Sequence, residues 1–321
     1  MRRYSKVLKL GALIGLAGVL VFPAQVYFEW REEQRAVEAF ESVAPSRFVR
    51  VILSPHEAWG EKLPGFLAVY LERCIWVDFS EQEISDHELR ELSSFPHLRN
   101  LRLNGATISD AGLKHLAGLS SLEYLGLEST RVTDEGLVHV GNIPKIYSLN
   151  LGGLSVTGRG LSHLSEAKTL QELALGRTAV VDDGLRHLSG LHTLRWLDLS
   201  YTSINGQGLS HVAKCPNLKI LDLKGTPITT ESLRHLSNHG SLHYLSLEDT
   251  KITNQGLGYL SELVNLGELR IVGTPVDDEG VRDLFAGAVN PVDFALIVSR
   301  GQLSQGFVDE LGALGVSVTQ L

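Results

Sequence analysis

Leucines recur along the middle of the chain with a strict period of 24 residues. From Leu98 to Asn265 one pattern is written seven times without an insertion, and its first copy reads LRNLRLNGATISDAGLKHLAGLSS. We number the places of each copy from 1 to 24. Leucine predominates at places 1, 4, 6, 16 and 19, threonine at place 9, isoleucine or valine at place 11, and glycine at place 15. One unit of this kind cannot bury its own apolar face, so the period predicts a solenoid of stacked repeats.

Each repeat is predicted to hold one short strand and one short helix. Leu101 and Leu103 alternate with Arg102, which puts the two leucines on the same side of a strand. A hydroxyl residue at place 12, such as Ser109, can cap a helix on which the leucines of places 16 and 19 share one face, with acids such as Asp134 at its positive end. Parallel strands add every ~4.8 Å, whereas the helices behind them need up to ~10 Å each. The stack is therefore predicted to curve into a horseshoe with its strands on the inner face.

The second half of the repeat resembles the 24-residue class of leucine-rich repeats, which reads roughly I-T-D-x-G-L-x-x-L. The segments ISDAGLKHL and VTDEGLVHV match this pattern closely. The resemblance implies an α/β solenoid with a parallel concave sheet and short convex helices. Threonine stands at place 9, where many members carry asparagine or cysteine, and its hydroxyl is expected to bond the backbone of the neighbouring turn. Because this family binds many unrelated partners, the resemblance implies a fold and not one activity.

Residues 10–28 are predicted to form a single transmembrane helix. These 19 residues carry no charge, and as a helix they would extend about 28 Å, close to the ~30 Å thickness of a hydrocarbon core. Four basic residues precede the segment and acidic residues follow it, so the N-terminus is expected in the cytoplasm and the repeats on the other side. The alternative is a cleaved signal peptide and a secreted repeat protein, because the most apolar part, residues 10–22, is only 13 residues long. Phe22 argues against cleavage after Ala24, since a small residue is wanted at its position.

The chain is thus expected to have four parts. They are a cytoplasmic basic tip and transmembrane anchor (residues 1–30), a juxtamembrane stalk and N-terminal cap (31–73), the leucine-rich repeats (74–290) and a C-terminal cap (291–321). Caps are needed because the end of a solenoid exposes its leucine core. Strands are expected within residues 48–53, 294–298 and 316–321, and a helix is expected to carry Phe307 and Leu311.

The composition and the motifs of the chain limit the partners and the chemistry that can be expected of it. The 321 residues carry a formal charge of −8, which disfavours nucleic acid as a partner. Of the two cysteines, Cys215 takes a leucine place and Cys74 opens a strand, so both are expected to be buried apolar residues. No phosphate loop, nucleophile elbow, H-E-x-x-H or C-x-x-C motif is present in the sequence, so neither an enzyme, a cofactor, a metal site nor a small-molecule substrate is predicted.

One histidine pattern invites a metal or pH hypothesis. Place 18 is histidine in six consecutive repeats, namely His115, His139, His163, His187, His211 and His235. Ligands of one ion bind at ~2.1 Å, whereas successive helices of the stack lie ~8 to 10 Å apart, so a shared metal is excluded by distance. We expect a surface row that recurs with the repeat, and a pH-responsive convex surface is the alternative.

The inner face is the predicted binding surface. Its places 2, 3, 5, 7 and 8 carry seven basic and eight acidic residues from Arg99 to Gly273, so it is nearly neutral. Place 3 puts Trp196, Ile220 and Tyr244 on three adjacent strands, where they are expected to form one exposed apolar strip. Tyr201, Asp198 and Asp222 flank this strip, and we assign all six residues to partner binding. The alternative is that the aromatic residues only pack across the strands.

The sequence therefore predicts a membrane-anchored interaction module that binds a protein or glycan partner through its concave face. The organisation also resembles that of bacterial leucine-rich repeat proteins with a short N-terminal anchor. A different reading is a substrate-recruiting subunit of a ubiquitin ligase, because similar repeats follow F-box domains, and LPGFLAVYL (residues 63–71) is similar to part of an F-box helix. An extracytoplasmic topology would exclude that reading.

Overall fold

The computed structural model describes residues 50–52, 76–81, 84–95 and 97–321. These residues fall into two compact units, the first made of those up to Arg131 together with Asn142–Ile146, and the second made of Val132–Gly141 and Tyr147–Leu321. The predicted transmembrane helix, the stalk and the F-box-like segment lie outside the described residues. Within the described ranges, no helix is long and apolar enough to cross a membrane.

In the first unit, parallel strands pair in chain order and alternate with short helices. The strands are β1 (Arg50–Ile52), β2 (Trp76–Asp78), β3 (Asn100–Arg102) and β4 (Tyr124–Gly126). The helical segments are α5 (Asp86–Leu89), η1 (Arg90–Ser94), α6 (Asp110–Leu113) and η2 (Lys114–Leu116), of which η1 and η2 are 3-10 helices. The strand expected within residues 48–53 is present as β1.

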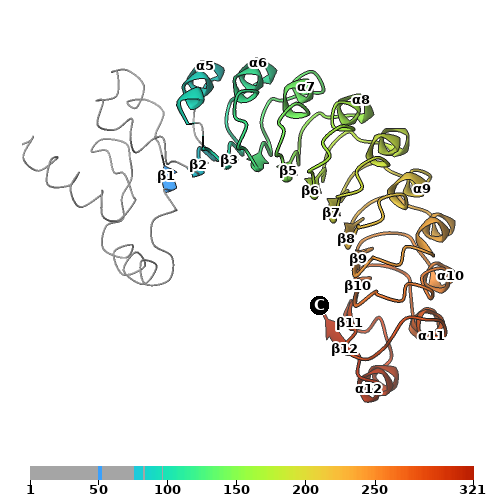
Figure 1. The fold of residues 1–321 in the computed structure, drawn as a ribbon. Coiled ribbons are helices and arrows are strands. Elements are labelled where there is room, and N and C mark those ends of the chain that lie inside the picture. Colours follow the sequence, from blue (N-terminus) through green and yellow to red (C-terminus); the bar gives the residue numbers. More distant parts are fainter. Residues whose placement is uncertain (1–49, 53–75, 82–83, 96) are drawn as a thin grey trace, which may run out of the picture. The chain divides into compact units, whose positions relative to one another are not determined.

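The second unit repeats one strand and one helical segment over most of its length (Figure 1). Its strands are β5 (Ser148–Asn150), β6 (Glu172–Ala174), β7 (Trp196–Asp198), β8 (Ile220–Asp222), β9 (Tyr244–Ser246), β10 (Glu268–Arg270), β11 (Ala295–Val298) and β12 (Ser317–Gln320). Its helical segments are α7 (Leu137–Val140), α8 (Gly158–Ser162), η3 (Asp182–Leu188), α9 (Leu209–Val212), η4 (Thr230–Leu236), α10 (Asn254–Gly258), α11 (Asp278–Phe285) and α12 (Gln305–Ala313). The two strands and the helix expected after residue 290 are present as β11, β12 and α12.

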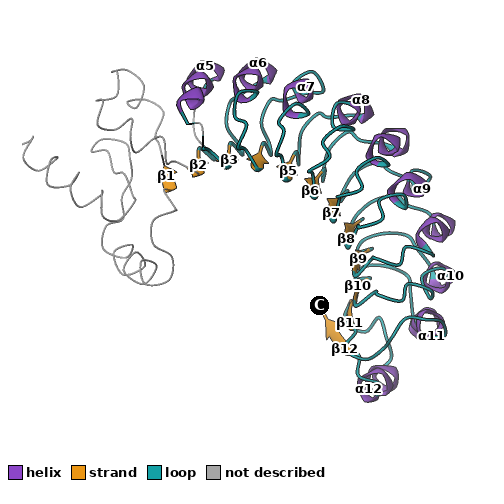
Figure 2. Cartoon of the chain, in the orientation of Figure 1, coloured by secondary structure: helices purple, strands orange, loops and turns teal. Residues whose placement is uncertain are grey.

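The strands of the second unit pair in parallel and in the register that the repeat predicts. Leu173 pairs with Leu197, Leu197 with Leu221 and Leu221 with Leu245, so equal places of successive repeats lie side by side. Strands line the inner side of this curved stack and the helical segments its outer side (Figure 2). The leucines of places 4 and 6 point between these two layers, where Leu197 and Leu199 are fully buried. The predicted solenoid with a parallel inner sheet is confirmed for this unit.

The turns between strand and helix are tied together from repeat to repeat. One carboxylate oxygen of Asp134 accepts the backbone N–H of Thr157 at 2.7 Å, and the other accepts its hydroxyl at 2.5 Å. Asp86 makes the same pair of contacts with Ser109. The acids of place 13 were expected to stabilise their own helix through its dipole, and these bonds show that they also hold place 12 of the following repeat.

The place 9 threonines bond the backbone, although not where the pattern predicts. The hydroxyl of Thr202 donates to the carbonyl of Leu199 at 2.7 Å, and that of Thr226 donates to the carbonyl of Leu223 at 2.5 Å. Each acceptor lies three residues earlier in the same repeat, and not on the neighbouring turn. Each hydroxyl therefore satisfies a carbonyl at the end of its own strand.

Candidate functional site

The predicted apolar strip lies on three adjacent strands of the second unit. Trp196 on β7 pairs with Ile220 on β8, and Ile220 pairs with Tyr244 on β9, so the three side chains follow one another across the sheet. All three are half-buried, whereas the pattern predicted an exposed strip. Burial raises the pKa of the Tyr244 phenol above its ordinary value. The strip is therefore a surface with one side packed against its neighbours and one side open.

The two acids beside the strip also hold the backbone beyond the strands. Asp198 accepts the backbone N–H of Ser200 at 2.8 Å, and Asp222 accepts that of Lys224 at 2.9 Å. Burial raises the pKa of the Asp222 carboxyl, although the bonds that it accepts act in the opposite direction. These carboxylates are thus partly committed to the local turn, which the sequence analysis did not foresee.

Tyr201 lies beyond the strip, in a stack with a residue of the preceding repeat. It is 43% exposed, and the guanidinium carbon of Arg177 lies 4.7 Å from the centroid of its ring. On the following repeat, a Cβ added to Gly225 would lie 2.5 Å from Cδ1 of Tyr201, so the ring covers that glycine closely. Arg177 and Tyr201 have φ angles of 58° and 55°, a left-handed conformation that costs roughly 1–2 kcal/mol for a residue with a side chain.

This backbone conformation recurs at place 8, where several other repeats use glycine. Gly153, Gly225 and Gly273 occupy the place with φ between 65° and 72°. Other repeats also carry a side chain at this place with a similar φ, as at Ser129 (57°) and Asp249 (55°), so the left-handed turn belongs to the repeat and is not particular to Arg177 and Tyr201. Arg177 is added to the candidate surface because it stacks on the exposed ring of Tyr201.

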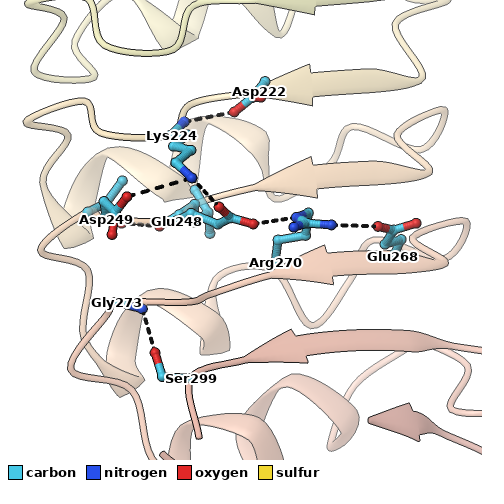
Figure 3. Close-up of polar contacts among 10 residues, drawn as sticks. Asp222, Lys224, Glu248, Asp249, Glu268, Arg270, Gly273 and Ser299 are labelled. Atoms are coloured by element: carbon cyan, nitrogen blue, oxygen red, sulfur yellow. Dashed lines mark hydrogen bonds and ion pairs between the residues drawn. The ribbon is translucent and has the colours of Figure 1, made fainter. Parts of the chain in front are cut away.

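Next to the strip, Glu248 joins two cations (Figure 3). Its carboxylate is bonded by Nζ of Lys224 at 2.6 Å and by Nε of Arg270, and the residue is only 5% exposed. Burial alone would raise the pKa of Glu248, but the two charged donors outweigh burial and hold the pKa below its ordinary value. Arg270 also lies near Glu268, with 3.8 Å between Nη1 and Oε1. Sequence reasoning missed this network, because Arg270 occupies a different place of the repeat from Lys224 and Glu248.

The remaining chemical candidates lie away from the inner face. Cys215 is fully buried and its Sγ lies 3.3 Å from the carbonyl oxygen of Leu188. Burial raises the pKa of its thiol to about 11, so it is an apolar core residue, as predicted. The six histidines of place 18 are partly exposed. Across the described ranges, no group of three or more His, Cys, Asp or Glu side chains could hold a metal ion.

The inner face of the second unit thus combines an apolar strip, a stacked pair and an ion-pair network. The strip supplies apolar area, Tyr201 and Arg177 form a stacked pair, and Glu248 offsets one of the two positive charges of Lys224 and Arg270. A reaction would need a nucleophile or an acid–base pair converging on one substrate atom. Here the charged groups are spread along the sheet instead.

Two segments of the chain match the leucine-rich repeat family model, residues 96–117 and 214–237. An internalin of Listeria monocytogenes, InlF, has a similar structure with a TM-score of 0.54 and 20% identity, over 87% of this chain and 88% of that one. Internalin C2 of the same species gives a TM-score of 0.52 and 20% identity, over 63% and 82% of the two chains. No curated protein sequence matches the chain. The matched segments and the shared fold together support a leucine-rich repeat family for this protein.

Proposed function

We propose that this protein is a membrane-anchored interaction module that binds another protein through the inner face of its second unit. The observation that carries the proposal is the register of Trp196, Ile220 and Tyr244 on β7, β8 and β9. Aromatic residues in a partly desolvated row are the usual centre of a protein-binding surface. The internalin-like fold supports a binding scaffold over an enzyme.

The surroundings of the strip favour binding over packing alone. Cross-strand packing would account for Trp196, Ile220 and Tyr244, but it leaves Tyr201 and Arg177, an aromatic residue and an arginine on the same face, exposed to solvent. An aromatic platform with nearby acids would also suit a glycan, so a glycan partner is the second outcome that an experiment has to separate.

The anchoring part of the proposal rests on the uncharged residues 10–28 and the basic residues before them. With this topology the N-terminus lies in the cytoplasm and the repeats are displayed on the other side of the membrane. The F-box alternative requires the repeats in the cytoplasm, so the two functions differ in the side of the membrane on which the repeats lie, which can be measured.

A photo-crosslinking amino acid at Ile220 tests the binding surface in intact membranes. We expect a discrete crosslinked protein that persists after enzymatic deglycosylation and is lost when Trp196→Ala is combined with the crosslinker. A crosslinker at Lys214, an exposed residue that follows α9, is the matched control and should not give the same product. A product that disappears on deglycosylation would favour a glycan partner. Equal products from both positions would show that the inner face is not the binding surface.

A further inference from the structure

A basic row borders the apolar strip on one side. Arg195, Lys219 and His243 each directly precede a strip residue, and all three are exposed. Neither Arg195 nor Lys219 forms a side-chain ion pair with any residue in the described part of the chain. Two positive charges therefore lie next to Trp196 and Ile220 without an ion-pair partner among the described residues.

An acidic row borders the strip on its other side. Asp198 and Asp222 each lie two residues after a strip residue, on β7 and β8, and they are half-buried. One oxygen of each carboxylate is bonded by a backbone N–H, which fixes its position. Along these two strands and the residue before each, the order is therefore basic, apolar and acidic, within about 10 Å at ~3.3 Å per residue.

The dimensions of these rows match an α-helix lying across the strands. Neighbouring strands are ~4.8 Å apart, close to the ~5.4 Å pitch of a helix, so each turn would face one strand. Same-side residues of an extended chain are ~6.6 Å apart and would lose this match within a few strands. The width of the three rows also approaches the ~10 to 12 Å diameter of a helix.

Acidic residues limit the length of the contact. Glu172 on β6 and Glu268 on β10 occupy place 3 on either side of Trp196, Ile220 and Tyr244, and both are partly exposed. The apolar row thus spans three strands, which suits an apolar stripe of about three helical turns.

We propose that β7, β8 and β9 bind an amphipathic α-helix of the partner protein. Its apolar stripe lies on Trp196, Ile220 and Tyr244. Acidic residues on one flank of the helix face Arg195 and Lys219, and basic residues on its other flank face Asp198 and Asp222. This inference rests on the proposed function, because it names the kind of protein segment that the inner face takes.

Displayed helical peptides test the inference. The library consists of peptides of about four turns, roughly 15 residues, with leucine or phenylalanine along one stripe and glutamate or lysine varied independently on each flank. It is panned against the purified full-length chain in detergent. We expect enrichment of helices with glutamate on one flank and lysine on the other, and loss of peptides with the same charge on both.

Charge exchange then tests the orientation. Lys219→Glu should weaken binding of an enriched peptide about tenfold or more, and replacing the facing glutamates of the peptide by lysine should restore it. Lys214→Glu makes the same charge change after α9 and should leave binding unaltered. Two results overturn the inference and leave the proposed function intact. One is a set of peptides that need Trp196 but show no preference for the charge on either flank. The other is a bound peptide that shows no helix by circular dichroism. Failure to enrich any peptide also overturns the inference. The proposed function is removed by a separate result, namely equal crosslinked products from Ile220 and Lys214.

Discussion

The guanidinium of Arg177 lies 4.7 Å from the centroid of the Tyr201 ring, and both residues have a left-handed backbone. The stack links two repeats at the end of their strands, and the ring covers Gly225 on the third. The cation–π contact contributes about 0.5–1 kcal/mol at an exposed site, whereas each left-handed residue costs roughly 1–2 kcal/mol. The cation–π contact therefore offsets only part of the backbone cost of the two residues.

Two substitutions of Tyr201 separate the backbone strain from the ring. Tyr201→Ala and Tyr201→Gly both remove the stack, but only glycine also relieves the left-handed strain at φ 55°. We expect the free energy of unfolding of the glycine variant to exceed that of the alanine variant by about 1 kcal/mol, measured by urea denaturation. An alanine variant as stable as the glycine variant would show that the backbone is unstrained. Both variants should bind the partner less well than the parent protein.

Replacing Glu248 tests the buried network. Glu248→Gln removes the charge that Lys224 and Arg270 share, so we expect a loss of about 1–3 kcal/mol in the free energy of unfolding. Asp249→Asn is the matched control, because the Asp249 side chain is 53% exposed and lies 3.8 Å from Nζ of Lys224. Its effect should stay within about 0.5 kcal/mol.

The stability of Glu248→Gln should also depend on acid pH differently from that of the parent protein. The pKa of Glu248 is lower in the folded protein than its ordinary value, so its contribution is complete above the unfolded pKa and is lost as the pH falls through the folded one. The parent protein should therefore lose more stability than Glu248→Gln between about pH 6 and about pH 3. Parallel curves for the two proteins would contradict the assignment.

The repeat pattern predicts the fold because the period determines which residues become neighbours. Equal places of successive repeats meet across the sheet, so the pairing of Trp196, Ile220 and Tyr244 follows once the strand is located. Burial of the isoleucine or valine at place 11 follows in the same way, and Ile204 and Ile228 are 0% and 1% exposed. These results depend on backbone register and on hydrophobicity alone.

The missed features depend on side-chain direction and on backbone dihedrals. Lys224 and Glu248 share place 7 of adjacent repeats, but Arg270 belongs to place 5 of the next one, so no single row of the pattern shows the network. The left-handed place 8 had a visible signal, since glycine recurs there, for example at Gly225 and Gly273. The partial burial of the strip could not be foreseen, because it depends on the conformations of the long side chains around it, which the repeat pattern does not give.

His239 should make stability depend on pH near neutrality. It is 6% exposed, and its Nε2–H donates to the carbonyl of Cys215 at 3.1 Å. Burial lowers the pKa of this imidazole in the folded protein, so the unfolded chain takes up the proton first. Its contribution is complete above the unfolded pKa of about 6.5 and is lost as the pH falls from there through the folded pKa.

The measurement is the free energy of unfolding across that range for the parent protein and for His239→Gln. The variant should be less stable at about pH 7.5 and should show a shallower decline on acidification. The free energy of unfolding of the variant should still fall somewhat with pH, because burial also lowers the pKa of His115 and His187. An unchanged slope in His239→Gln would mean that this residue does not titrate in the predicted window.

The proposed anchor predicts a definite topology. Since residues 10–28 carry no charge and basic residues precede them, the mature protein should keep Met1 and leave the membrane only in detergent. Protease added to the outer side of intact cells should digest the repeats. Terminal sequencing and protease protection measure the two properties. A soluble species that begins near Gln25 would favour the signal-peptide alternative, and protected repeats would favour a cytoplasmic role.

The strip and the leucine core should respond differently to alanine. Trp196 and Tyr244 are half-buried on the open side of the sheet, whereas Leu197 is fully buried behind it. Trp196→Ala or Tyr244→Ala should weaken binding of the crosslinked partner by about 2 kcal/mol, roughly thirtyfold, at a smaller cost in the free energy of unfolding. Leu197→Ala should cost about 2–5 kcal/mol of stability, because it leaves a cavity between sheet and helices. Titration of the purified partner and urea denaturation of each variant provide the two measurements. If the aromatic variants lose as much stability as Leu197→Ala while binding is unaltered, the three residues only pack across the strands, and the binding surface lies elsewhere.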